Sequence, residues 1–442
     1  MGKDINKFIE YEAFGRYPKI YPKNAIKINW IDELSKIKNL DKYLPRGYGK
    51  SYGDSCLIED GTLVDTTNLN HLISFDKESR IVEAEAGVQF STLLDFLLPN
   101  KSFLPVTPGT KYISLAGAIA NDVHGKNHFK KGTFGNHTLE FELLRTNGEI
   151  LTCSHTQNID LFNATIGGLG LTGVITKAKF KAIPVSNPYM YVENIKFKNL
   201  NEFFEVNEDS EQDFVYTVAW IDSTAKGKSI GRGIYNRGNH TNPNLHKVSE
   251  NEGGLPILPF PFDYPFINNL SVKAFNLLWY NKQIKKKENV IAHYNPFFYP
   301  LDGVNDWNKS YGKNGFLQYQ FVIPTEKGKV LLPKILNDIS NSGLSSFLVV
   351  LKTFGDIKSP GMLSFPEPGI TLAIDFRMDG EKTLKLLDHL DKYIVELGGR
   401  IYPAKDARMK AEHFKLFYPN WKEFLQFKDP NITSAFWERV MK

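Results

Sequence analysis

A short stretch early in the chain combines glycines with basic and hydroxylated side chains. It runs from Arg46 to Asp54, and Gly47, Gly49 and Gly53 alternate with Tyr, Lys and Ser residues. Glycine accepts positive φ and lets another group approach the backbone closely. Successive N–H groups that turn inward form a nest for an anion. We therefore predict a loop that holds a diphosphate, and an ordinary glycine-rich turn is an equally good interpretation of this stretch alone. A Walker loop is excluded, because it needs Gly-x4-Gly-Lys-Ser/Thr before a helix.

A second polar group lies at residues 124–128, where His124 and His128 flank Gly125, Lys126 and Asn127. Such side chains are costly to bury without partners. A His-x3-His pair on a helix could bind zinc, but the glycine and the asparagine disfavour a helix here. We predict the polar wall of an active site, and a solvated loop is the alternative.

Two further patterns have competing interpretations. Residues 168–173 match Gly-x-Gly-x-x-Gly, which is typical of a nicotinamide-binding Rossmann fold when it follows a strand and opens a helix. Here a predicted helix precedes the glycines and a predicted strand follows them, so we interpret them as a helix-to-strand turn. In residues 316–323, period-two alternation places Gln318 and Gln320 on one strand face. Two amides there could hold hydroxyls or a flat heterocycle, or the face could be solvated.

The composition is that of an ordinary globular protein of 442 residues, which is long enough for two domains. The net charge of +5, on 54 basic and 49 acidic side chains, is too balanced to indicate nucleic acid binding. Cys56 and Cys153 fit neither a metal site nor a disulfide framework, which favours a reducing compartment. We find neither an apolar signal core nor a run of about 18–20 apolar residues, and we expect a cytoplasmic protein.

The predicted elements indicate an α+β fold in which helices pack against an antiparallel sheet. Residues 253–279 are rich in Pro, Phe, Leu and Trp, and we predict an irregular apolar segment that faces the substrate or a membrane. The predicted helices are 30–38, 90–98, 160–165, 326–341 and 380–397, and the predicted strands lie at 81–86, 174–183, 213–235 and 316–323.

Taken in order, the motifs resemble those of FAD-linked oxidases of the vanillyl-alcohol oxidase type. They are Arg-Gly-x-Gly-x-Ser-x-Gly at 46–53, Pro-Gly-Thr at 108–110, Gly-Ala-Ile-Ala at 117–120 with His-Gly at 124–125, and the glycine turn at 167–175. The resemblance runs from about residue 43 to the C-terminus. Within that superfamily the chain is most similar to the decaprenylphosphoryl-β-D-ribose 2-oxidases. The signs are residues 124–128, Phe-Gly-Asn-His at 134–137, residues 315–324 and Ala-Lys-Asp at 404–406.

The resemblance implies a split FAD-binding domain, residues 1–187 and 400–442, around a substrate-binding domain of residues 188–399. The fold class is then α+β, with an antiparallel sheet flanked by helices in the second domain. The residues implied in FAD binding are Arg46, Gly47, Tyr48, Gly49, Lys50, Ser51, Tyr52, Gly53, Asp54, Gly109, Thr110, Ser114, Gly117, Ala118, Asn121, Asp122, His124, Gly125, Ile175 and Tyr402.

Three positions depart from the family pattern. Relatives with covalently bound flavin carry His where Lys50 stands, so we expect non-covalent FAD. The nearest relatives carry Cys where this chain has Ala373, so a thiol cannot be essential here. They carry Tyr where this chain has Phe298, which removes one polar contact to substrate.

The implied reaction is oxidation of the 2-hydroxyl of a polyprenylphosphoryl-β-D-ribose to the 2-keto sugar lipid, the first half of epimerisation to the arabinose form. The alternatives are an aldonolactone or sugar-alcohol oxidase on the same scaffold and a flavin-binding protein without enzymatic activity. Lys405, Tyr52 and His124 are the expected catalytic residues. The expected substrate contacts are Lys126, Trp220, Gln318, Gln320, Lys352 and Lys405.

The expected partners follow from the implied product. A 2-keto sugar lipid requires a nicotinamide-dependent keto-reductase to complete epimerisation. A prenyl substrate implies peripheral contact with the inner face of the membrane. We expect neither a metal ion nor nucleic acid.

Overall fold

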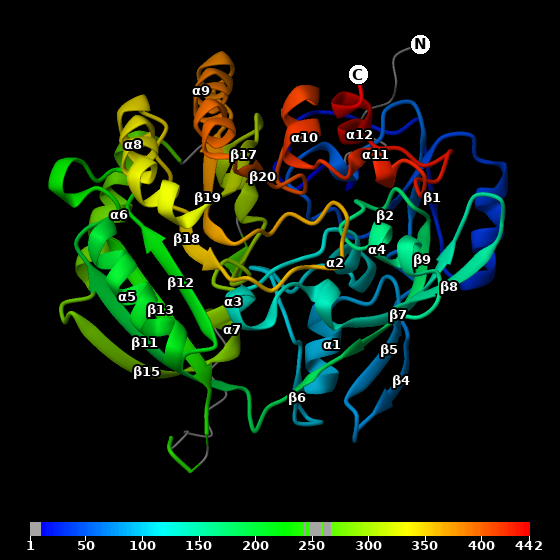
Figure 1. The fold of residues 1–442 in the computed structure, drawn as a ribbon, viewed down its shortest axis with the longest axis horizontal. Helices are drawn as coiled ribbons and strands as arrows, with labels where there is room; N and C mark the ends of the chain where they lie inside the picture. The colour runs from blue at the N-terminus through cyan, green and yellow to red at the C-terminus, as the bar shows by residue number, and fades with distance from the viewer. Residues whose placement is uncertain (1–9, 243, 247–257, 260–266) are drawn as a thin grey trace.

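The computed structural model describes residues 10–242, 244–246, 258–259 and 267–442. Two smaller sheets occupy the first part of the chain and one large sheet occupies the middle (Figure 1). The three-stranded sheet has the order β1-β3-β2 and is parallel. Its strands are β1 (Asn24–Lys27), β2 (Tyr43–Arg46) and β3 (Thr62–Asp65).

A five-stranded antiparallel sheet follows, with the order β4-β5-β9-β7-β8. Apolar side chains of these strands form one core together with α1 (Phe90–Leu97), whose buried residues recur at helical spacing. Its strands are β4 (Leu72–Asp76), β5 (Ile81–Glu85), β7 (Thr138–Leu144), β8 (Ile150–Ser154) and β9 (Val174–Lys181).

The large sheet has eight antiparallel strands in the order β15-β11-β13-β12-β18-β19-β17-β20. Its strands are β11 (Tyr189–Phe197), β12 (Tyr216–Ile221), β13 (Gly233–His240), β15 (Lys287–His293), β17 (Phe316–Ile323), β18 (Val349–Phe354), β19 (Gly369–Arg377) and β20 (Arg400–Ile401). Two short pairs complete the strands: β6 (Ser102–Phe103) with β10 (Ile183–Pro184), and β14 (Leu258–Pro259) with β16 (Val304–Asn305).

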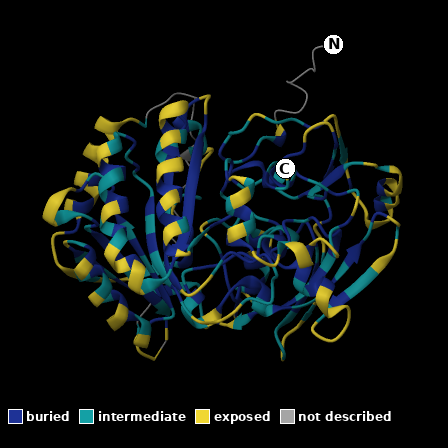
Figure 2. Ribbon diagram, turned by 45° about the horizontal axis from the view of Figure 1, so that its top comes forward, coloured by how far each residue is buried: buried dark blue, intermediate teal, exposed yellow. Residues whose placement is uncertain are grey.

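Helices α5, α8 and α9 cover one face of the large sheet, and their exposed residues lie on the outer side of this layer (Figures 1 and 2). The helices are α1 (Phe90–Leu97), α2 (Leu115–Ala120), α3 (His128–Lys131), α4 (Ile159–Thr165), α5 (Leu200–Asp213), α6 (Asn269–Lys282), α7 (Tyr294–Phe298), α8 (Thr325–Ser342), α9 (Glu381–Leu397), α10 (Ala411–Phe417), α11 (Trp421–Phe424) and α12 (Ala435–Val440). Short 3₁₀ helices lie at Ile31–Asn39, Asp54–Cys56, Phe134–His137, Gly227–Ser229 and Trp307–Tyr311.

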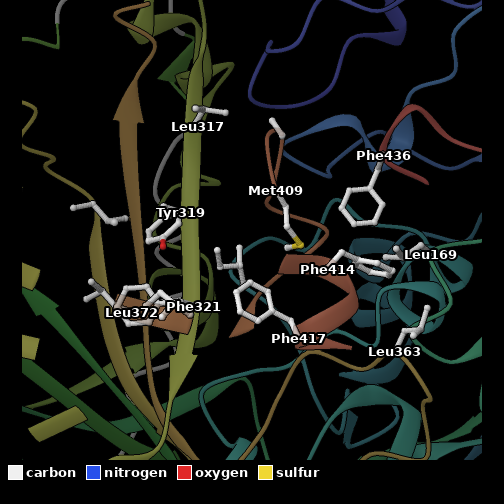
Figure 3. Packing of buried hydrophobic residues seen from close by; sticks show 14 of the residues in the cluster. Leu169, Leu317, Tyr319, Phe321, Leu363, Leu372, Met409, Phe414, Phe417 and Phe436 are labelled. Carbon is white, nitrogen blue, oxygen red and sulfur yellow. The ribbon is translucent and has the colours of Figure 1, made fainter. Parts of the chain in front are cut away.

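The C-terminal helices return to the first part of the chain and pack beside the large sheet. Figure 3 shows Phe414 and Phe417 of α10 between Tyr319 and Phe321 of β17 on one side and Phe436 of α12 on the other. Backbone bonds also tie the two ends together, since the N–H of Tyr43 donates to the carbonyl of Asn431 over 3.0 Å. The mixed helices and antiparallel sheets confirm the α+β class. The division of the chain at residues 187 and 400 stays a prediction, and β20 joins the large sheet.

The helix predicted at residues 30–38 is present as a 3₁₀ helix over Ile31–Asn39. One local prediction is wrong. The irregular segment predicted at 253–279 contains the helix α6 from Asn269 onward. Asn268 caps this helix by accepting from the N–H groups of Leu270 and Ser271, and that capping signal outweighs the proline-rich composition before it. Residues 253–257 and 260–266 lie outside the described residues.

Candidate active site

The glycine loop that follows β2 has the geometry of an anion nest. Among the described residues, the N–H groups of Tyr48, Gly49, Lys50 and Ser51 donate to no acceptor in the protein. The buried Nε of Arg46 also lacks a partner. Four successive free donors beside a guanidinium suit a phosphate group.

The glycines of this loop are required by space as well as by conformation. Gly49 has φ +62°, and a Cβ there would lie 1.9 Å from Nη2 of Arg46. At Gly47 a Cβ would lie 2.4 Å from Oγ of Ser114, which begins α2. At Gly53 it would lie 1.6 Å from the carbonyl oxygen of Asp406. The loop is therefore pressed between α2 and the segment after β20.

Several side chains predicted to bind the cofactor are used within the protein instead. The carboxylate of Asp54 accepts from Arg439 at 2.8 and 2.9 Å, and that of Asp122 accepts from the N–H of Gly135 at 2.9 Å. Oγ of Ser114 accepts from the N–H of Gly117 at 3.1 Å. These residues shape the site, and their carboxylate and hydroxyl groups already have partners.

The remaining predicted cofactor residues lie around the same region. The hydroxyl of Tyr402 donates to the carbonyl of Asn121 over 2.8 Å, which joins the end of α2 to the segment after β20. Gly109 is exposed, and a Cβ there would meet no atom within 4 Å. Thr110, Tyr48 and Lys50 are half-buried, and Ala118 and Ile175 are buried. Burial lowers the pKa of Lys50, whose Nζ lies 5.2 Å from the ring centroid of Phe14.

His124 is buried in an aromatic setting beside the large sheet. The rings of Phe354, Phe365 and Tyr402 lie 4.8, 5.6 and 5.4 Å from its ring centroid. Nε2 of Gln320, on β17, lies 3.0 Å from Nε2 of His124. Nδ1 of His124 has no hydrogen-bond partner within the described part of the chain. Burial is the main cause that lowers the pKa of His124 well below its usual value, and the positive charge of Lys352 is the second cause. The imidazole is therefore neutral at pH 7.

Two lysines lie close to this histidine. Nζ of Lys352, on β18, donates to the carbonyl of Gly125 over 3.0 Å. Nζ of Lys126 donates to the carbonyl of Phe297 at the end of α7. Burial lowers the pKa of each lysine to about 7. Both are therefore poised to gain a full charge when an anion reaches them.

A second polar group lies on the same sheet face, and its Lys405 is close enough to lower the pKa of His124 and Lys352. Nζ of Lys405 lies 3.7 Å from the ring centroid of Tyr52. Nε2 of Gln318 donates to Oδ1 of Asp375 over 2.6 Å, and the hydroxyl of Tyr311 donates to Oδ2 over 3.4 Å. Burial raises the pKa of Asp375 to about 7 and lowers that of Lys405 to about 7, and the negative charge of Asp375 opposes the second shift.

Strand register explains why these groups meet. On strands β17 and β19, Gln318 pairs with Asp375 and Gln320 pairs with Ala373. The register continues across β18 and β12, where Ala373 pairs with Val350 and Val350 pairs with Trp220. Residues in register across antiparallel strands point to the same face of a sheet. One face therefore presents Trp220, Ala373 and both glutamines, and all eight residues of β17 are buried. A solvated glutamine face and a solvated loop at 124–128 are both wrong.

Some expectations fit the site less directly. Nε1 of Trp220 donates to the carbonyl of Phe347 over 2.8 Å, so its polar atom is used within the protein. Phe298 is buried against Tyr216 and Phe103, with ring centroids 4.9 and 5.3 Å away. Its apolar surroundings explain how a phenylalanine is accommodated at this position.

The sequence did not single out Asp375, Tyr311 or the aromatic wall of Phe354 and Phe365. The charged Asp375 in residues 369–376, a strand whose other polar side chain is Thr371, was a signal that could have found it. Its pairing with Gln318 depends on the register of strands that are distant in sequence, which no local pattern contains.

The glycines at 167–173 do not form a nicotinamide-binding loop. Residues 167–173 lie between α4 and β9, which confirms the helix-to-strand turn in place of a Rossmann glycine loop. Among the described residues no group of three or more His, Cys, Asp or Glu side chains could hold a metal ion. Both cysteines are free.

Comparison with known proteins identifies the family of this chain. The FAD binding domain family matches residues 33–154. The decaprenylphosphoryl-beta-D-ribose oxidase of Mycolicibacterium smegmatis is 37% identical over 410 residues, which are 89% of this chain and 87% of that protein. The chain belongs to the FAD-linked oxidase family. Like other FAD-linked oxidases it uses FAD as its cofactor, and the free N–H groups and the orphaned Nε of Arg46 fit the diphosphate.

Other FAD-linked oxidases match shorter parts of the chain. A putative D-arabinono-1,4-lactone oxidase of Neurospora crassa is 33% identical over 39% of this chain and 31% of that protein. The L-gulonolactone oxidase of Mus musculus is 25% identical over 39% of each. In the part of the chain that the structure describes, no helix is both long and apolar enough to cross a membrane.

Proposed function

We propose that this chain oxidises the 2-hydroxyl of a polyprenylphosphoryl-β-D-ribose to a ketone. The observation that carries the proposal is the group formed by Lys405, Tyr52, Asp375 and Gln318 on the sheet face beside the cofactor loop. The likeness to the M. smegmatis oxidase over 89% of the chain supports the same substrate class.

Bound FAD would supply the hydride acceptor for the sugar carbon, and residues 46–54 would hold its diphosphate. Lys405 in its neutral form takes the hydroxyl proton, and burial favours that form because it lowers the lysine pKa to about 7. Tyr52 keeps its proton, since burial raises its pKa well above the usual value, and it can donate to the sugar oxygen. The C–O single bond becomes a carbonyl as the proton and the hydride leave.

The other polar side chains hold the substrate. Lys126 and Lys352 supply positive charge for the substrate phosphate. Gln318 and Gln320 supply amides for the sugar hydroxyls, and the neutral His124 supports Gln320. Trp220 and the aromatic wall exclude water from this face.

Three further features complete the proposal. FAD is held without a covalent bond, because Lys50 stands at the position of the linking histidine. Acid precipitation should release all yellow colour into the supernatant, and colour that stays with the polypeptide would refute this.

The 2-keto product passes to a nicotinamide-dependent keto-reductase, and the protein makes peripheral contact with the membrane that holds its substrate.

The decisive experiment is anaerobic addition of a water-soluble, short-prenyl phosphoryl ribose to the purified flavoprotein, followed by its visible spectrum. We expect the flavin bands to bleach.

The Neurospora relative favours an aldonolactone oxidase as the second candidate. Bleaching by an aldonolactone and not by the prenyl sugar would select that second activity and reject the first.

A further inference from the structure

Helix α6 is attached to the protein by a narrow and largely polar stripe. Only Val272, Asn276 and Tyr280 are buried, and they recur every fourth residue along one side. Nδ2 of Asn276 donates to Asp222 over 3.0 Å, and the hydroxyl of Tyr280 donates to the carbonyl of Phe197 over 3.2 Å. The side of the helix that faces the protein is therefore held largely by hydrogen bonds, and most apolar residues of the helix lie on its other sides.

Those apolar residues face outward. Leu270, Leu278 and Ile284 are 79%, 72% and 89% exposed. A surface helix of a globular protein normally shows the reverse pattern. Six of the 17 large apolar side chains that are exposed among the described residues fall within positions 270–284, which makes this a patch and not scatter. The α6 apolar face consists of Leu270, Phe275, Leu277, Leu278 and Trp279 of the helix, together with Ile284 just after it.

Lysines border this face. Nζ of Lys282 lies 5.1 Å from the ring of Trp279, and Lys273 and Lys285 are exposed nearby. Among the described residues these three lysines pair with no carboxylate, whereas Lys286 and Lys287 pair with Glu202 and Glu193. Exposed apolar side chains with a tryptophan and free lysines at their edge are typical of a helix that lies in a lipid interface.

The α6 apolar face is continuous with the candidate active site. The ring of Phe275 lies 5.8 Å from that of Phe347, which lies 6.1 Å from that of Tyr311. The hydroxyl of Tyr311 reaches Asp375. Figure 1 shows α6 at the edge of the molecule. A chain of three aromatic rings therefore leads from the outer surface to the catalytic group.

We propose that the α6 apolar face docks this protein on an anionic lipid surface. Its aliphatic side chains enter the boundary between headgroups and acyl chains, and Lys273, Lys282 and Lys285 contact lipid phosphates. The aromatic rings behind it give an apolar route for the tail of a membrane-held substrate, and this last step rests on the proposed function. A lipid surface is favoured over a protein partner because the free charges near the patch are lysines and a tryptophan lies beside one of them, as at lipid interfaces.

The test is co-sedimentation of the flavoprotein with vesicles of phosphatidylcholine and phosphatidylglycerol, and with vesicles of phosphatidylcholine alone. We expect sedimentation with the anionic vesicles that weakens as salt is raised. Leu278→Glu should reduce binding at least about tenfold, since a charge at that depth opposes insertion. Lys282→Gln with Lys285→Gln should reduce binding about fivefold for each lysine.

The matched control is Leu416→Glu, which places the same change on the exposed side of α10 and should bind as the wild type does. Every variant should keep its flavin spectrum and its rate of bleaching by the short-prenyl substrate without vesicles, which separates this proposal from the proposed function. The absence of vesicle binding by the wild type would overturn the proposal, as would binding that Leu278→Glu leaves unchanged. A wild-type dimer that Leu278→Glu converts to a monomer would identify the face as a contact between copies and would also overturn it.

Discussion

At the scale of single residues, Lys405 carries the chemistry that we propose. Replacement by Met keeps most of the side-chain length and removes the base. We expect Lys405→Met to slow bleaching of the flavin by substrate about 10²–10⁴-fold, which is the usual contribution of a positioned acid–base group. Bound FAD should be retained, since the change leaves the free N–H groups of residues 48–51 and the guanidinium of Arg46 in place.

Anaerobic stopped-flow absorbance measures this rate. Lys410→Met is the control, because Lys410 is exposed and lies five residues further along the chain. Normal bleaching in Lys405→Met would remove this lysine from the mechanism.

Asp375 sets the pH at which that base works. Lys405 acts when neutral and its pKa is about 7, so the rate of bleaching at saturating substrate should rise with pH through that value. The negative charge of Asp375 raises the lysine pKa, and Asp375→Asn should therefore move the rise to lower pH by about one unit. The amide keeps an acceptor for Gln318, so the geometry should be preserved.

The same profile separates binding from chemistry. Lys126 and Lys352 lose charge as the pH passes about 7, so KM should increase at alkaline pH while kcat stays at its plateau. Asp379→Asn, an exposed change near the end of the same strand, should leave the profile unmoved. A profile that Asp375→Asn does not shift would show that the carboxylate does not act on Lys405.

At the scale of elements, the glycine loop depends on one backbone conformation. Gly49→Ala places a side chain at φ +62°, which costs about 1–2 kcal/mol, and drives its Cβ into the guanidinium of Arg46. We expect FAD affinity to fall about tenfold or more, as measured by flavin fluorescence during titration of the apoprotein. Gly303→Ala is the control, because the nearest atom to its Cβ would be 3.8 Å away. Equal affinities in the two variants would mean that the loop does not hold the diphosphate.

Elements with local signals could be predicted from the sequence. The alternation in residues 316–323 gave the face of Gln318 and Gln320, and the order of glycines and strands at 167–175 excluded a Rossmann loop. Two features could not be found in this way. The pairing of Asp375 with Gln318 depends on strands more than 50 residues apart in sequence. The sequence did not predict helix α6, for two reasons. The proline-rich run before Asn268 indicated an irregular segment, and the apolar residues of the helix face outward, so they do not show the spacing of a helix packed on a core.

At the scale of the whole molecule, the C-terminal helix α12 locks the cofactor loop in place. Arg439 donates to Asp54 at the end of the glycine loop and to Asp406 beside Lys405, at 2.8 Å in both cases. The two carboxylates are buried, with exposed side-chain fractions of 3% and 5%. One guanidinium therefore joins the loop that holds FAD, the segment that carries the base and the end of the chain.

Arg439→Met should consequently weaken both folding and cofactor binding. Removal of one partner leaves buried charges without compensation, which costs about 3–5 kcal/mol. The free energy of unfolding from urea titration should fall by that amount, and FAD should dissociate at lower urea than in the wild type because Gly53 packs on the carbonyl of Asp406.

The matched control is Lys42→Met, which removes an ion pair between the first part of the chain and Glu438 of the same helix. That pair is more than a third exposed, so its loss should cost less than about 1 kcal/mol. If both variants lost the same small amount of stability, the Arg439 contacts would be no more than a surface pair. A large loss in Arg439→Met alone, with early release of FAD, would show that the end of the chain holds the cofactor site together.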